Sequence, residues 1–106
     1  MDEITLAQES LQLVRKDLGL TEELPLDQVD DPFERLLDFL EKRIKYMLDV
    51  DFAGLLNALY RIDLPEERVK ALLELTPPQQ LAHEIAKAII ERQKEKVITR
   101  RLYRPS

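Results

Sequence analysis

Residues that commonly carry out chemistry are scarce in this chain, which contains one histidine and no cysteine. His83 precedes Glu84, as in the helical zinc motif His-Glu-x-x-His, in which two histidines one turn apart bind the metal. Position 87 is a lysine, so the second ligand is missing, and no glutamate stands three residues before the histidine as carboxylate-bridged metal bundles require. We therefore expect His83 to be a solvated helix residue, and we expect neither a metal nor a cofactor.

A second candidate is the segment from Asp49 to Gly54, which has aspartates at its first and third positions and a glycine at its sixth, as in a calcium-binding loop. Such a loop needs oxygen ligands at its fifth and twelfth positions, and these are Ala53 and Tyr60. The segment therefore lacks the chemistry of a calcium site. Asp51 is better explained as a helix N-cap, because its carboxylate can accept hydrogen bonds from the free amides of the first turn.

Other catalytic arrangements are also missing. The only serines, Ser10 and Ser106, stand outside any nucleophile motif, and two glycines are too few for a phosphate-binding loop. The acidic pairs at 30–31 and 66–67 precede helical segments, where acids offset the positive end of the helix dipole. We therefore expect that the protein is not an enzyme.

The most distinctive feature is a basic C-terminal segment. From Lys87 onward seven basic residues stand against two acidic ones, although the whole chain has a net charge of -5. The end of this segment also carries apolar residues that a monomer would leave partly wet, and surfaces of this kind form protein interfaces. We expect a protein partner or a second copy of the chain to bind through Lys94, Val97, Ile98, Arg100, Arg101, Leu102, Tyr103 and Arg104.

Two other interpretations of the C-terminal segment are open. Arginines beside a tyrosine can bind phosphate and stack on bases, which makes nucleic acid the alternative partner, although the acidic remainder of the chain repels a phosphate backbone. Residues 91–104 could also pack on the first helix or the linker of the same chain, as an ordinary basic helix end.

The helices that must position this segment are predicted by an apolar periodicity along most of the chain. Apolar residues recur every three or four positions in five stretches, and residues that favour strands never alternate with polar ones over a strand length. The pattern predicts an all-α fold, a small bundle of four to five helices with a long C-terminal helix, in a single domain over residues 1–106. A linker at 20–30 joins the first two helices, and a basic tail occupies 99–106.

Capping residues and prolines predict where the helices begin and end. The first helix covers Ile4–Leu18, with Asp2 or Thr5 as its N-cap and Gly19 as its C-cap. Asp31 is the N-cap of the second helix, and later helices begin after Asp51, around 63–67 and around 76–79. A last helix that continues to Arg101 would be about 37 Å long, so its end would overhang a globule with a radius of gyration of about 13 Å or pack along its edge.

The core is expected on the apolar faces of these helices. Leu40 and Ile44 lie mid-helix on the second, and Leu20, Leu24 and Leu26 hold the linker against the core. In the remaining helices the expected buried residues are Ile4, Ala7, Leu11, Val14, Leu18, Phe33, Leu36, Leu37, Met47, Leu48, Phe52, Leu55, Leu56, Leu59, Tyr60 or Ile62, Val69, Leu72, Leu73, Leu81, Ala82, Ile85, Ala86, Ile89 and Ile90.

The sequences at 59–67, 88–93 and 99–100 resemble small bacterial all-helical proteins, over residues 33–101. The resemblance implies a bacterial cytoplasmic protein and transfers no functional residue. The acidic N-terminus lacks the features of a signal peptide, and no apolar run is long enough to span a membrane, so we expect a soluble cytoplasmic protein. The expected function is a non-catalytic protein-interaction or regulatory module, with self-association as one form of it.

Overall fold

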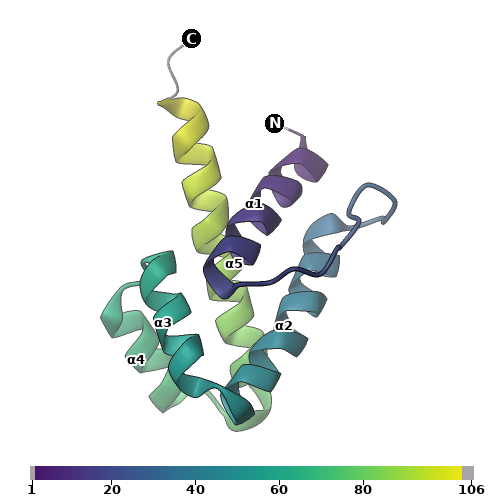
Figure 1. The fold of residues 1–106 in the computed structure, drawn as a ribbon. Coiled ribbons are helices and arrows are strands. Elements are labelled where there is room, and N and C mark those ends of the chain that lie inside the picture. The colour runs from purple at the N-terminus through teal and green to yellow at the C-terminus, as the bar shows by residue number, and fades with distance from the viewer. Residues whose placement is uncertain (1, 104–106) are drawn as a thin grey trace.

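The computed structural model describes residues 2–103 and contains five helices (Figure 1). Helix accounts for 79% of the structure, and the described residues form no strand. The helices are α1 (Glu3–Leu18), α2 (Pro32–Val50), α3 (Phe52–Ile62), α4 (Glu66–Leu75) and α5 (Pro78–Leu102). The predicted all-α bundle with a long C-terminal helix is therefore confirmed.

Aspartates begin the first three helices. Asp2 accepts a hydrogen bond from the Ile4 amide and is therefore the N-cap of α1. The carboxylate of Asp31 accepts from the Glu34 amide at 3.0 Å, and that of Asp51 accepts from the Gly54 amide at 3.0 Å. These bonds satisfy amides that the helix itself leaves unpaired. The predicted role of Asp51 as a helix N-cap is confirmed.

Left-handed residues end α1 and α3. Gly19 has φ +65°, a conformation in which a side chain would be strained, and its amide donates to the Arg15 carbonyl. Asp63 takes the same role after α3 with φ +66°, and it is the one non-glycine residue of the described chain with positive φ. Both turns redirect the chain sharply, so the next segment folds back onto the body.

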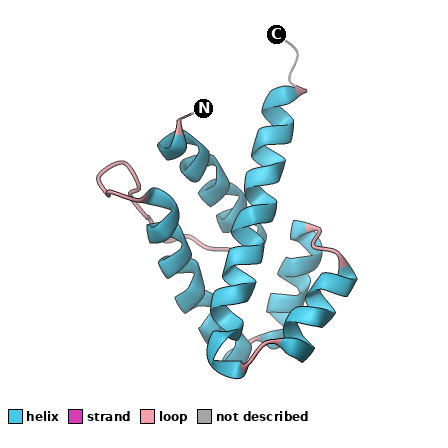
Figure 2. Cartoon of the chain, turned by 180° about the vertical axis from the view of Figure 1, so that it is seen from behind, coloured by secondary structure: helices cyan, strands magenta, loops and turns pink. Residues whose placement is uncertain are grey.

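Helix α5 is the structural axis of the molecule. The molecule measures 42 × 29 × 22 Å, and 25 helical residues extend about 37 Å. Figure 2 shows α5 running along the bundle, with α2 on one side and the hairpin of α3 and α4 on the other. The residues of α5 that are buried against the other helices are Ala82, Ile85, Ala86, Ala88, Ile89, Ile90, Gln93 and Val97.

One continuous apolar core joins α1, α2, α3, α5 and the linker. Leu40 and Ile44 are fully buried, as predicted. The linker leucines at 20, 24 and 26 are also buried, which explains how a segment without helix or strand stays against the body.

Two aromatic residues of α3 are exposed instead of buried. Phe52 is 43% exposed because it is the first residue of α3, at an end of the bundle that no other helix covers. Tyr60 is exposed while Ile62 is buried, so Ile62 was the correct choice of the two. Ile4, Phe33, Leu37, Leu48, Leu56 and Leu81 are half-buried rather than fully buried.

Helix α4 is the least embedded element. It contains no fully buried residue, and its expected core residues Val69, Leu72 and Leu73 are only partly buried. No side chain caps its start, because Pro65 occupies the N-cap position. A ten-residue helix with so little burial derives little stability from packing.

No helix of the described chain is both long enough and apolar enough to cross a bilayer.

Truncating a central core residue should destabilise the fold strongly. Leu40→Ala removes three carbons from a fully buried site, and we expect it to lower the free energy of unfolding by about 2–5 kcal/mol. Lys45→Ala, at an exposed position of the same helix, should change it by no more than about 0.5 kcal/mol. Urea titrations of the two variants measure the difference, and equal midpoints would contradict the assignment of the α2 core face.

The weak embedding of α4 should be visible in hydrogen exchange. Amides of α4 should exchange at least about tenfold faster than those in the middle of α2 and α5, because α4 has no fully buried residue of its own and therefore little packing that opposes local opening. Native-state exchange followed by NMR tests this residue by residue. Equal protection of α4 and α2 would show that the hairpin opens only with the whole fold.

Candidate interaction surface

The C-terminal half of α5 packs antiparallel to α1. Arg101 forms an ion pair with Glu9 at 2.8 Å, and the Gln93 amide donates to Asp17 at 2.9 Å. Eight residues along α5 therefore match eight residues along α1 in the opposite direction. Because a matched separation fixes the register, these two contacts hold the end of α5 against the first helix.

Gln93 is an unexpected core residue. The side chain is fully buried, and its carbonyl oxygen has no hydrogen-bond partner. Positions 85, 89, 93 and 97 are four apart, so Gln93 continues the buried face of α5 from Ile89 to Val97. In the sequence this polar residue makes the apolar pattern look as if it ends at Ile90. The four-residue spacing through Gln93 was the available signal.

The structure divides the predicted partner-binding residues into two groups. Val97 is only 2% exposed, so the expectation that it contributes surface area is wrong; it fills the seam between α5 and its neighbours. The ammonium group of Lys94 lies 4.3 Å from the ring centre of Phe33 on α2. Arg101 pairs with Glu9, so Lys94, Val97 and Arg101 all face other parts of the same chain.

The other group faces outward. Leu102 is 75% exposed and Tyr103 is 82% exposed, and Ile98 and Arg100 are also exposed. Arg100 forms no ion pair with any residue that the structure describes. Arg104 lies outside the described residues. We call Ile98, Arg100, Leu102 and Tyr103 the α5-end patch.

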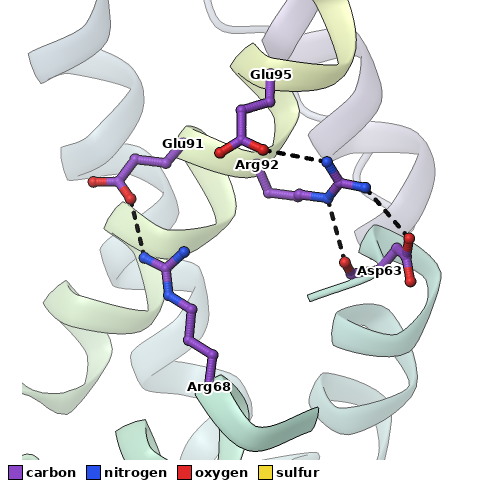
Figure 3. Close-up of polar contacts among 5 residues, drawn as sticks. All are labelled: Asp63, Arg68, Glu91, Arg92 and Glu95. Carbon is purple, nitrogen blue, oxygen red and sulfur yellow. Dashed lines mark hydrogen bonds and ion pairs between the residues drawn. The ribbon is translucent and has the colours of Figure 1, made fainter. Parts of the chain in front are cut away.

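Ion pairs use further basic residues to attach the hairpin of α3 and α4 to α5 (Figure 3). Arg92 donates to the backbone carbonyl and to the carboxylate of Asp63, both at 3.3 Å, and also reaches Glu95 on its own helix. Arg68 of α4 donates to Glu91 at 3.0 Å. The basic charge of α5 is therefore partly neutralised inside the molecule.

A second exposed apolar group lies at the opposite end of the bundle. Helices α2 and α4 end there, and α3 and α5 begin there (Figure 1). We call this end the base, and we call its exposed side chains the base patch: Tyr46, Val50, Phe52 and Leu75. The sequence analysis missed this patch, because its residues lie near the termini of three different helices and only Tyr46 and Val50 are connected by helical spacing.

His83 was expected to be a solvated helix residue. The structure instead shows it half-buried, and its Nδ1 pairs with Glu41 of α2. This contact links α2 to α5. Within residues 2–103, no three histidine or acidic side chains gather closely enough to hold a metal ion. An apolar hollow between α3 and α4, lined by Leu56, Tyr60 and Val69 among others, offers no cluster of polar groups for catalysis.

One lysine on α5, Lys96, has a lowered pKa. Burial lowers the pKa of Lys96, and Arg92 and Lys16 lower it further, against the opposing effect of Asp17 and Asp63. The charged form therefore costs folding free energy at neutral pH.

Comparisons of this chain with family models, with curated proteins and with solved structures found no match.

Replacing Lys96 with a neutral side chain should stabilise the protein. Lys96→Met removes the penalised charge, so its thermal midpoint should exceed that of the wild type at pH 7. The gap should narrow as the pH rises through the lowered pKa, because the wild-type lysine then loses its proton in the folded state and the unfolded chain binds more protons. Thermal melts of both proteins from pH 7 to pH 10 measure this, with Lys45→Met as the control at an exposed position. If the difference in thermal midpoint between Lys96→Met and the wild type does not change with pH, the stabilisation comes from packing and not from removal of the charge.

Proposed function

We propose that this chain is a non-catalytic protein-interaction module that binds its partner through the α5-end patch. The observation that carries the proposal is the exposure of Leu102 and Tyr103, two consecutive residues at the end of a helix that α1 holds in place. Large apolar side chains cost hydration free energy when they stay in water, and tyrosine and arginine are enriched at protein interfaces. As part of the proposal the protein works in the cytoplasm, for which the absence of cysteine is supporting evidence.

The anchoring of α5 supports binding by a preformed surface. The Arg101–Glu9 pair and the buried Val97 hold the last turns in one orientation, so the patch loses little conformational entropy when a partner binds. A patch on an unanchored tail would lose more.

Nucleic acid is the weaker candidate partner. Lys94, Arg92 and Arg101 are engaged inside the chain, so few basic groups of α5 remain for phosphates. Binding to nucleic acid should weaken steeply with salt, because each neutralised phosphate releases counterions, whereas an apolar interface should be far less sensitive. Fluorescence anisotropy with a labelled single-stranded oligonucleotide distinguishes the two partners.

The proposal is tested by changing the patch without cutting the helix. The double variant Leu102→Ser/Tyr103→Ser alters two exposed side chains, so it should fold with an unchanged circular dichroism spectrum. Tyr60→Ser is the matched control, because it removes an exposed tyrosine outside the patch. In affinity capture from native lysate, the double variant should lose at least about tenfold of the partner that wild type and control retain.

Truncation after Glu91 is unsuitable, because it removes Gln93 and Val97 from the buried seam. Equal capture by the double variant and the wild type, in moderate and in high salt, would contradict the proposed role of the patch.

A further inference from the structure

The apolar hollow between α3 and α4 is a space that the side chains of the hairpin leave unfilled. Its volume is about 80 Å³, and carbon atoms form almost all of its lining. Leu59 and Leu64 are buried at its inner side, whereas Tyr60 is 68% exposed at the side that opens to solvent. The residues around the hollow are Leu56, Leu59, Tyr60, Leu64, Glu66 and Val69.

The hollow lies beside the least embedded helix. Helix α4 makes more backbone contact with α5 than with α3, and Val69, which faces the hollow, is only half-buried. Atoms that face an unfilled space lose the dispersion contacts that a neighbour would supply. A molecule that filled the hollow would therefore add packing between α4 and α3, where the chain itself supplies little.

Water is a poor occupant of this space. A buried water needs two to four polar partners, and the lining of the hollow offers almost none. An engineered apolar cavity of roughly 150 Å³ stays dry and binds benzene. The hollow has about half that volume, and its open side accommodates the part of a ring-sized molecule that does not fit inside.

The rim favours a free small molecule over the side chain of a partner protein. Glu66 and Glu67 are exposed in the first turn of α4, and neither forms an ion pair with any residue that the structure describes. A protein surface that covered the hollow would have to remove these carboxylates from water, which costs free energy. A small molecule in the hollow leaves both of them solvated.

We propose that the hollow is a binding site for a small neutral apolar molecule, of the size of one aromatic ring or a short branched hydrocarbon, and that its occupation stabilises α4 on the body. The bound molecule contacts Leu56 of α3 and Val69 of α4 together, so it joins the two helices. A ligand that binds only the closed hairpin stabilises it by mass action. This site is separate from the α5-end patch and does not depend on the proposed function.

Titration of the isotope-labelled full chain with benzene, followed by NMR, tests the site. Methyl signals of Leu56, Leu59, Leu64 and Val69 should shift in a saturable manner. Amides of α4 should exchange about threefold more slowly at a benzene concentration of twice the Kd, because the opened hairpin does not bind.

Filling the hollow with a side chain should replace the ligand. Val69→Phe places a ring in the hollow from α4, and Leu56→Phe does so from α3, so the test does not depend on one variant that folds. Each should bind benzene at least about tenfold more weakly, because the space is already occupied. Val50→Phe is the matched control, because it adds the same ring at an exposed position outside the hollow, and it should bind benzene as the wild type does.

The outcomes separate this inference from the proposed function. No saturable shifts up to the solubility limit of benzene, or shifts confined to the α5-end patch or the base patch, overturn the site. Saturable binding that leaves exchange of the α4 amides unchanged overturns the stabilisation of α4. The double variant Leu102→Ser/Tyr103→Ser retains the hollow and should bind benzene normally, so failure of the proposed function would leave this inference standing.

Discussion

Burial of one long face of α5 is the constraint on which the rest of the structure depends. The buried residues of α5 extend from Ala82 to Val97, and α1, α2, α3 and α4 all contact this helix. A face of that length cannot be covered by a single neighbour, so each part of α5 has its own partner. Loss of α5 would expose the apolar faces of its neighbours together, which predicts that the core unfolds cooperatively.

The packing on α5 combines two kinds of contact with different consequences. Helices α1 and α2 bury apolar residues deeply against it, whereas α4 is attached mainly by partly buried side chains and the Arg68–Glu91 pair. Exposed ion pairs contribute little free energy because water already solvates both charges. The molecule therefore has a well-packed body of α1, α2, α3 and α5, and α4 is attached to its surface more weakly.

Several basic residues of α5 form ion pairs within the molecule, so the basic segment offers less free positive charge to a partner than the sequence suggests. The basic segment that follows Lys87 suggests an attractive surface for polyanions, but Arg92 and Arg101 join α5 to Asp63 and Glu9. In the described part of the last turn, Arg100 is exposed and forms no ion pair, so its charge is available to a partner. The acidic and basic parts of the chain thus pair mainly with each other. The exposed surface that remains at the end of α5 is both apolar and charged.

Local sequence determined the helices, because caps and periodicity act over a few residues: Asp31 and Asp51 mark helix starts, Gly19 marks an end, and the spacing around Leu40 and Ile44 marks a core face. The exposure of Leu102 and Tyr103 was also predictable, because a helix of about 37 Å is too long for a globule of this size to cover fully. The four-residue spacing from Ile85 to Val97 was compatible with burial of Gln93 and Val97, but only the packing of other helices decided it. The contact of His83 with Glu41 likewise depends on a helix distant in sequence. The base patch is of the same kind: its residues come from the termini of three helices, and only the packing of those helices on α5 brings the termini to one end of the molecule.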